Sequence, residues 1–347
     1  MKKFLSIALA LLMVCVMLPV VALAAEKTAL TYEELKSAIS TANDGDTIKL
    51  LADIDLSQTI TVNKTITLNM NGKKLYNTSD LWDKPTAEAN NWSLISVRGS
   101  GNLTITGNGT FAAKENDCYA VDVQESATVT IKNGTFIGNI HAVYVFAGTA
   151  NVEGGTYSVQ QKYPDSAKGD EFVLNCYDAN RANGTARINV TGGTFKNFNP
   201  ADNKAEGEGN NFADNSLVVQ KNNTVQNNDY YVGNAANEVI AAASKGEEIF
   251  VLNGTTLTNV PAGVIIQNRT GDRITVNGKD VELTGDAGYT VPASNITIIV
   301  PGDTTPAETP KTEDQKNPST GANDFVGLAA AAAVVALLGS AVVLRKK

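Results

Sequence analysis

The carboxylates with the best spacing to hold a metal ion gather in one segment of the sequence. They are Asp165, Asp170, Glu171 and Asp178, and Arg181 follows them. Carboxylate oxygens of this kind suit calcium. Solvated charges on a surface loop explain the same residues without a metal, and that interpretation is favoured. No cofactor is predicted, and calcium is the one metal that stays open.

His141 is the only histidine in the sequence, so any Ser-His-Asp or Cys-His site must use it. It opens a predicted strand at a position where a corner or surface residue is expected. Cys118 is a candidate partner, but nothing around it in the sequence predicts a lowered thiol pKa. No CxxC, HExxH or phosphate-binding loop occurs. The sequence therefore favours a protein that is not an enzyme.

Aromatic residues offer a different chemistry, the binding of sugar rings. Outward aromatic side chains beside Asn and Asp suit stacking on sugars together with hydrogen bonding. A repeat in the sequence gives Asp122 and Tyr144 the same outward parity one coil apart, so they are the predicted ligand-binding pair. Ordinary half-buried strand aromatics are the alternative. The other candidates are Trp82, Trp92, Tyr119, Tyr163 and Tyr177.

The repeat is a short phrase that recurs four times. Its copies are Gly109-Thr110-Phe111, Gly134-Thr135-Phe136, Gly155-Thr156-Tyr157 and Gly193-Thr194-Phe195. The apolar pairs that precede these copies at strand spacing are Leu103/Ile105, Val129/Ile131, Ala150/Val152 and Ile188/Val190. A repeat this short, with glycine corners, is one coil of a solenoid whose coils must stack to bury a core. The sequence predicts an all-β parallel β-helix with an aromatic ladder at one corner.

A second strand also recurs from coil to coil. Its copies predict an inward ladder of Ile95, Val121 and Val143 and another of Val97, Val123 and Val145, because like side chains stacked in register fill a narrow core. Cys118 and Cys176 precede coils that are two steps apart, so their backbones are expected roughly 10 Å apart. That separation exceeds the reach of a disulfide, and two free, buried thiols are predicted.

Two helices are expected at the ends of the predicted solenoid. Tyr32–Asn43 has an amphipathic pattern, with Thr31 as N-cap and Glu34 at the capping-box position. We expect this helix to cover the open edge of the first coil. Glu238–Lys245 reads as a second helix within residues 233–300, which form either a small second module, the favoured interpretation, or a cap on the first.

Both ends of the chain carry targeting signals. Met1–Ala24 has a basic start, an apolar run and small residues at its end, which predicts a secretory signal peptide. Phe325–Leu344 is apolar and long enough to cross a bilayer as a helix. Arg345-Lys346-Lys347 follows it and is expected to stay in the cytoplasm.

The segment before this helix reads Asn317-Pro318-Ser319-Thr320-Gly321. Motif, helix and basic tail in this order resemble the cell-wall sorting signal of Gram-positive surface proteins, usually written LPxTG. Asn317 replaces the usual leucine, as in variants read by other sortase classes, so the particular sortase stays open. The resemblance implies that a sortase cuts after Thr320 and joins it to peptidoglycan. A plain single-span membrane protein is the alternative.

Residues 30–220 resemble the right-handed β-helix surface proteins of Gram-positive bacteria, relatives of the pectate-lyase-like superfamily. Hydrolases of that fold use paired aspartates with Gly-His-Gly and Arg-Ile-Lys motifs, and neither motif occurs here. Lyases of that fold use calcium with a basic residue, for which the acidic cluster before Arg181 is the local candidate. The formal net charge of −8 disfavours nucleic acid and polyanionic glycans as partners.

We therefore expect a non-enzymatic, wall-anchored surface protein on a Gram-positive cell, an adhesin or a carbohydrate-binding protein that passes through a single-pass membrane precursor. Its partners would be a sortase, peptidoglycan, and a host or environmental glycan or protein. A calcium-dependent polysaccharide lyase or glycosidase is the first alternative, and a structural wall component is the second. The predicted segments are a signal peptide (1–24), a β-helix with an N-terminal cap (25–232), a module or cap (233–300), a spacer (301–316), a sorting motif (317–321), a transmembrane helix (325–344) and a basic tail (345–347).

The sorting signal makes a direct prediction. Replacing Thr320 by Ala should abolish covalent attachment to the wall, because the scissile carbonyl would no longer be presented in the recognised motif. Mass spectrometry of protein released from purified walls measures the outcome. Peptides that continue through Gly321, or unchanged attachment of the variant, would contradict wall sorting.

Overall fold

The computed structural model describes residues 24–81, 92–115, 118–162, 171–201, 212–213, 217–221, 228–233, 235–254, 256–282 and 287–293. The predicted spacer, sorting motif and transmembrane helix lie outside these residues, as does the predicted signal peptide except for Ala24. The described residues contain no helix that is both long enough and apolar enough to cross a bilayer.

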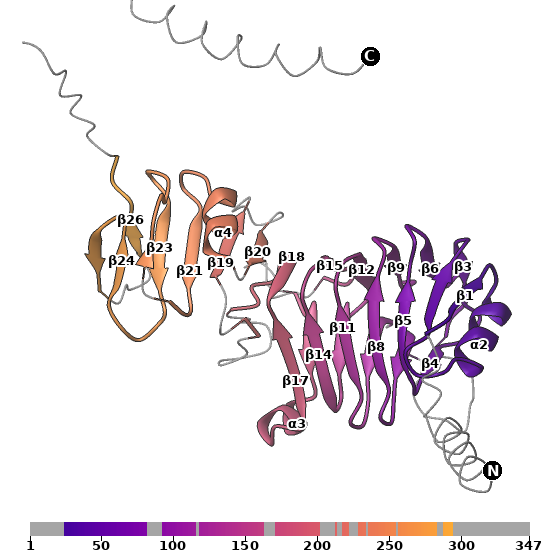
Figure 1. Cartoon of the computed structure of the whole chain (residues 1–347). Coiled ribbons are helices and arrows are strands. Elements are labelled where there is room, and N and C mark those ends of the chain that lie inside the picture. Colours follow the sequence, from indigo (N-terminus) through magenta and orange to yellow (C-terminus); the bar gives the residue numbers. More distant parts are fainter. Residues whose placement is uncertain are drawn as a thin grey trace, which may run out of the picture. The chain divides into compact units, whose positions relative to one another are not determined.

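Within the described residues, most of the chain forms three long β-sheets (Figure 1). Sheet A contains β1 (Glu26–Ala29), β2 (Thr47–Leu50), β5 (Thr65–Asn69), β8 (Asn102–Thr106), β11 (Thr128–Ile131), β14 (Gly148–Val152) and β17 (Ala186–Val190). Sheet C contains β4 (Ile60–Val62), β7 (Ser93–Val97), β10 (Tyr119–Val123), β13 (Val143–Val145) and β16 (Leu174–Cys176). Sheet B begins with β3 (Ile54–Asp55), β6 (Lys74–Tyr76), β9 (Thr110–Ala112), β12 (Thr135–Gly138), β15 (Thr156–Val159) and β18 (Gly192–Lys196).

From β2 to β18 the chain visits the sheets in the fixed order A, B, C. From β5 onward, each strand of this region pairs in parallel with the strand one coil before it, as β10 does with β7 and β13 with β10. These long parallel sheets are consistent with the predicted β-helix. The predicted ladders are confirmed, since Val121 pairs with Ile95 and Val143, and Val123 with Val97 and Val145.

The aromatic ladder is also confirmed, and it lies in sheet B. Phe111, Phe136, Tyr157 and Phe195 are fully buried. Consecutive ring centroids lie 4.8, 5.1 and 5.0 Å apart, with the ring planes within 13° of each other. The hydroxyl of Tyr157 donates to the carbonyl of Gly154 at 2.6 Å, so the one polar atom of the stack is satisfied.

Steric constraints explain why the repeated phrase begins with glycine. Gly134 and Gly155 have φ angles of +120° and +106°, a region that residues with a Cβ rarely adopt. A Cβ on Gly134 would lie 3.1 Å from the carbonyl oxygen of Gly109 in the coil before, and one on Gly155 would lie 3.0 Å from that of Gly134. The corner therefore requires glycine in each coil, which explains why the phrase repeats.

Helix α2 (Tyr32–Ser40) is capped as predicted but ends earlier than expected. The backbone N–H of Glu34 donates to Thr31 Oγ1 at 3.2 Å, and the Glu34 carboxylate accepts from the N–H of Leu30 at 2.7 Å. The predicted end at Asn43 is wrong because Asp46 accepts the N–H groups of Asn43 and Ala25, which holds that segment in a turn. The predicted apolar face is buried; its members are Leu35, Ala38 and Ile39.

Beyond β18 the pairing becomes mostly antiparallel. Sheet B continues through β20 (Asp229–Gly233), β19 (Leu217–Lys221), β21 (Glu248–Val251), β23 (Ile265–Asn268) and β26 (Tyr289–Thr290). A small sheet D contains β22 (Thr256–Leu257), β24 (Ile274–Val276) and β25 (Lys279–Val281), and the remaining helices are α3 (Asp178–Ala182) and α4 (Ala236–Ala242). The predicted Glu238–Lys245 helix is thus shifted towards the N-terminus.

Strand β19 takes part in two hydrophobic cores. Val218 belongs to the core of the parallel coils, whereas Leu217 and Val219 belong to a second core that includes Val239 and Ile240 of α4. This follows from the alternation of side chains along a strand. Whether residues 233–300 form a separate module or a cap stays a prediction. The second hydrophobic core includes side chains of β19, which precedes this segment in the sequence.

Both predicted thiols are free and buried, as expected. Burial raises the pKa of Cys118 to about 12. Cys118 is therefore not poised as a nucleophile.

The aromatic ladder makes a stability prediction. Phe136→Ala should lower the free energy of unfolding by about 3–5 kcal/mol, because it leaves a cavity between two stacked rings. Ile137→Ala is the matched control, since Ile137 is the next residue of β12 and is only partly buried; its effect should stay within about 1 kcal/mol. Urea unfolding of the chain from residue 25 measures both, and equal effects would show that the ladder does not dominate stability.

Candidate functional site

The predicted pair Asp122 and Tyr144 lies side by side on sheet C. The two residues are register partners on β10 and β13, one coil apart. They line a hollow of about 260 Å³. Its other lining residues are Trp92, Tyr119, Gln124 and Phe146. A volume of this size is below that of most enclosed small-molecule sites, and fits a groove that holds part of a longer ligand.

The aromatic rings around this hollow come from successive coils. The centroid of Tyr119 lies 6.2 Å from that of Trp92 and 5.0 Å from that of Tyr144. Further along, Phe146 stacks on Tyr177 at 4.9 Å. Trp92, Phe146 and Tyr177 are 37%, 39% and 44% exposed. Of the other predicted aromatic candidates, Trp82 and Tyr163 lie outside the described residues.

Asp122 has the outward parity that the sequence predicts, as the register partner of Tyr144 and a lining residue of the hollow, but its side chain is buried. It is only 2% exposed. Ser96 Oγ donates to one carboxylate oxygen at 2.9 Å, and Gln124 Nε2 donates to the other at 2.7 Å. Arg98 Nε donates in turn to Ser96 Oγ at 2.9 Å. The carboxylate is thus the floor of the hollow and holds its polar residues in place.

Burial raises the pKa of Asp122 to about 6, against the lowering effect of the bonds from Ser96 and Gln124 and of the charge of Arg98. Burial also raises the pKa of Tyr144 to about 12, with the Asp122 charge as a second cause. Sequence reasoning missed Ser96 and Gln124. The sequence did contain a signal for both residues. Ser96 is the register partner of Asp122, and Gln124 lies two residues after Asp122, on the same face of the strand.

His141 lies in the segment between β12 and β13, where a corner or surface residue was expected, and it is buried beside the hollow. Its Nδ1 lies 2.7 Å from the carbonyl oxygen of Phe172, which can only accept, so Nδ1 carries the proton. Nε2 then accepts from the Asn175 amide at 3.1 Å. Burial lowers the pKa of His141 to about 4. The ring stacks on Tyr144 at 5.5 Å and acts as a neutral wall of the aromatic cluster.

The structure describes only two of the four predicted calcium ligands, Glu171 and Asp178. Asp165 and Asp170 lie outside the described residues. Glu171 forms an ion pair with Lys162 at 3.2 Å, and Asp178 is the first residue of α3. In the part of the chain that the structure describes, no group of three His, Cys, Asp or Glu side chains is placed to hold a metal ion. Calcium binding by this cluster stays a prediction.

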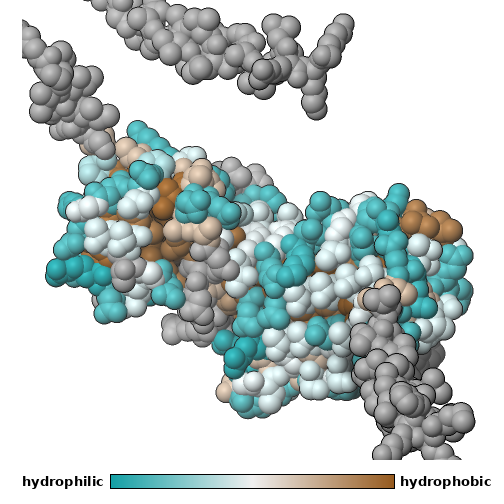
Figure 2. Space-filling view, viewed as in Figure 1, coloured by the Kyte–Doolittle hydropathy of each residue, from teal (hydrophilic) through white to brown (hydrophobic). Residues whose placement is uncertain are grey.

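The outer face of sheet A contrasts with the hollow on sheet C. Figure 2 shows that face as mostly white and teal, the colours of neutral and hydrophilic residues. Its side chains form a row in register: Thr67, Thr104, Thr130, Asn151 and Asn189. Asn189 Nδ2 donates to Asn151 Oδ1 at 2.9 Å, so neighbouring members of the row bond to one another. The exposed aromatic cluster is therefore a feature of sheet C and not of this face.

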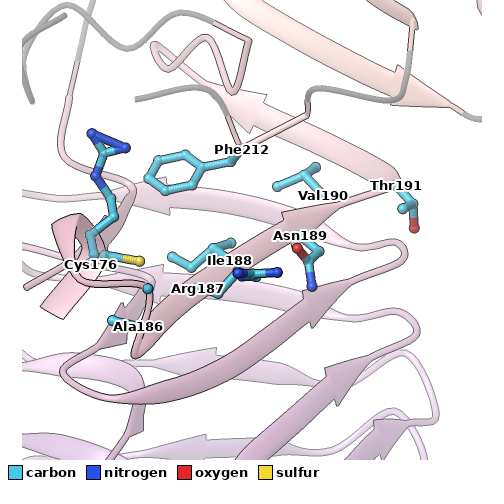
Figure 3. Close-up of a pocket in the computed structure, with 10 residues that line it drawn as sticks. Cys176, Ala186, Arg187, Ile188, Asn189, Val190, Thr191 and Phe212 are labelled. Carbon is cyan, nitrogen blue, oxygen red and sulfur yellow. The ribbon is translucent and has the colours of Figure 1, made fainter. Parts of the chain in front are cut away.

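A second hollow of about 340 Å³ runs along β17 (Figure 3). The residues of β17 line it together with Cys176, Arg181, Gly184, Thr191 and Phe212. Two arginines line it, and its one aromatic residue, Phe212, is buried, so its chemistry differs from that of the first hollow.

The chain matches no protein-family model, no curated protein and no solved structure. The side chains of the two hollows are therefore what a function must be argued from.

The buried carboxylate predicts a pH dependence of stability. The pKa of Asp122 rises from an ordinary 3.8 to about 6 on folding, so its contribution is fully present below pH 3.8 and is lost as the pH rises through 6. Asp122→Asn should therefore gain stability relative to the natural protein between these pH values, as measured by urea unfolding.

His141 has the opposite effect on the pH dependence of the free energy of unfolding. Because its pKa is lowered on folding, it stabilises the folded state above pH 6.5, and this contribution is lost as the pH falls towards 4. Subtracting the natural protein from the Asp122→Asn variant at each pH removes the histidine contribution from the comparison. A stability difference that stays flat between pH 3.8 and 6 would show that Asp122 is not held in a buried state.

Proposed function

We propose that this chain is a wall-anchored surface protein that binds carbohydrate through the hollow on sheet C. The observation that supports this best is the row of partly exposed rings, Trp92, Tyr119, Tyr144, Phe146 and Tyr177, beside fixed polar groups. Flat aromatic faces take the apolar face of a sugar ring, and the polar groups fix its hydroxyls.

The rings follow the stacking direction of the coils. Adjacent coils are separated by the strand spacing of about 4.8 Å. The rings of Phe146 and Tyr177, which continue the register of β13 with β16, have centroids 4.9 Å apart. A ligand lying along this row would contact side chains from several coils at once. This favours an extended glycan chain over a compact molecule. A right-handed winding of the β-helix belongs to the same proposal, because crossovers between parallel strands are almost always right-handed.

The charge of the site favours a neutral glycan. Asp122 is ionised above pH 6 and lies at the floor of the hollow. The chain as a whole carries a formal net charge of −8. A polyanionic glycan would be repelled by both, whereas neutral sugars accept and donate hydrogen bonds without an electrostatic cost.

Display on the cell surface rests on the terminal signals. The sorting motif ending in Thr320-Gly321 supports covalent attachment to peptidoglycan by a sortase, after a membrane-bound precursor stage. The glycan-binding coils would then face the surroundings of a Gram-positive cell. Host and environmental glycans are both accessible from that position.

A glycosidase is the second candidate, and the carboxyl of Asp122 is what favours it. A carboxyl group with a pKa near 6 is suited to act as a general acid. Against this, Ser96 and Gln124 each donate to the carboxylate, which holds it in the network that supports the hollow. Chain shortening in the binding assay is the outcome that would favour the enzyme.

The assay incubates the chain from residue 25, purified in mild detergent, with immobilised neutral and acidic glycans, with and without calcium. Tyr144→Ala should weaken retention of a neutral glycan by roughly tenfold, a loss of about 1.4 kcal/mol, because the aromatic face that stacks on the sugar ring is removed. Tyr76→Ala is the matched control, since Tyr76 is a partly buried aromatic of sheet B that does not line the hollow.

Retention that survives Tyr144→Ala, or is lost equally in both variants, would contradict the assigned site. Calcium-dependent shortening with unsaturated ends would replace the binding function by a lyase. Failure of every glycan to be retained would leave a structural role as the better proposal.

A further inference from the structure

Strand β17 forms the last edge of sheet A in the described residues. The order of that sheet runs from β1 to β17, and β17 pairs only with β14. Sheet B, by contrast, continues past β18 into β20. At the other end of sheet A, α2 packs beside β1 and covers the first coil. An uncovered strand edge is a template for pairing with another chain.

The backbone groups of β17 that face away from β14 can be identified from the alternation along the strand. Gly148 donates to the carbonyl of Thr185, and Thr191 donates to the carbonyl of Val152, so odd-numbered residues face β14. Val190 faces the other way and donates to the carbonyl of Phe212 at 2.9 Å. Residues of the same parity, Ala186 and Ile188, direct their N–H and C=O groups to the same open side.

The hollow of about 340 Å³ lies along this open side, as Figure 3 shows for β17 and Phe212. A strand added to β17 would lie about 4.8 Å from it, within the hollow. The bond from Val190 to Phe212 shows that backbone placed beside β17 is accepted there. The backbone N–H and C=O groups of Ala186 and Ile188 would form the next hydrogen bonds to such a strand.

Cationic side chains flank this edge. Arg187 is exposed on β17, and within the described residues it forms no ion pair. Arg181 lines the hollow from α3. In a chain with a formal net charge of −8, Arg187 places an exposed positive charge beside this edge, which favours a negatively charged ligand there.

We propose that the edge of β17 binds an extended, acidic polypeptide segment of a partner protein by strand addition. Main-chain bonds to Ala186 and Ile188 would hold the segment, and its alternate acidic side chains would lie beside Arg187. A glycan offers no matching ladder of amide groups. A second copy pairing through the same edge would bring two arginine clusters together, which opposes self-association.

The probe is a fluorescent peptide, acetyl-Thr-Glu-Val-Glu-Val-Glu-Thr-amide, added to the detergent-solubilised chain from residue 25 at low salt. Fluorescence anisotropy measures its Kd. Arg187→Glu should weaken binding at least about tenfold, because an attractive charge becomes a repulsive one. Arg269→Glu is the matched control and should leave the Kd within about twofold, since Arg269 is an exposed arginine outside the hollow.

Strand addition is separated from simple charge attraction by backbone methylation. Two versions of the peptide carry N-methyl groups on complementary sets of alternate residues, so that only one version blocks the N–H groups facing β17. One version should lose binding and the other should retain it. Equal behaviour of the two versions, or no binding of the unmodified peptide, would overturn the proposal.

Two further measurements keep the result interpretable. Thermal unfolding of Arg187→Glu should match that of the natural protein, and Asn189→Asp, a second exposed change on β17, should also weaken the peptide. Sedimentation velocity tests self-association. A dimer that Arg187→Glu dissociates would show that the edge is an interface between copies of this chain, which would overturn the proposal.

Discussion

The structure depends on stacking coils in register. Every coil places one strand in each of sheets A, B and C, and each strand must pair with the equivalent residues of its neighbour. A slip by one residue would turn each inward side chain to solvent. The aromatic ladder of sheet B depends on this register, because its rings stack at about 5 Å only when equivalent residues of successive coils are paired. The hollow on sheet C and the edge of β17 follow from the same alignment.

The parallel coils could be predicted because their determinants are local and repeated. The phrase ending in Phe136 or Tyr157 marks a corner in every copy, and the pairing of Val121 with Val143 follows from counting along the repeat. The antiparallel strands after β18 could not be predicted in this way. Alternation at Leu217–Val219 indicates a strand but not its direction, which depends on which sheet edge the chain meets next.

The candidate site was predictable to a similar extent. Parity and coil spacing place Asp122 beside Tyr144, and both were found there. The burial of Asp122 was not predictable, since it depends on side chains that pack around it in space, among them Ser96 and Gln124, which donate to its carboxylate. The burial of His141 has a similar origin, because Phe172 and Asn175 reach it from a later coil. Register can be read from a sequence, but the covering of one side chain by others requires the folded molecule.

Because the chain visits the three sheets in a fixed order, one coil is the unit by which this part of the molecule can be lengthened or shortened. One complete coil, from sheet A through B to C, adds one strand to each sheet and one ring to the ladder. Duplication of such a unit would lengthen the binding row by one step and leave all other coils in register. Gain or loss of a partial coil would break three sheets at once. Changes in length within this part of the chain are therefore tolerated in whole coils, and the reach of the surface can evolve in steps of one strand spacing.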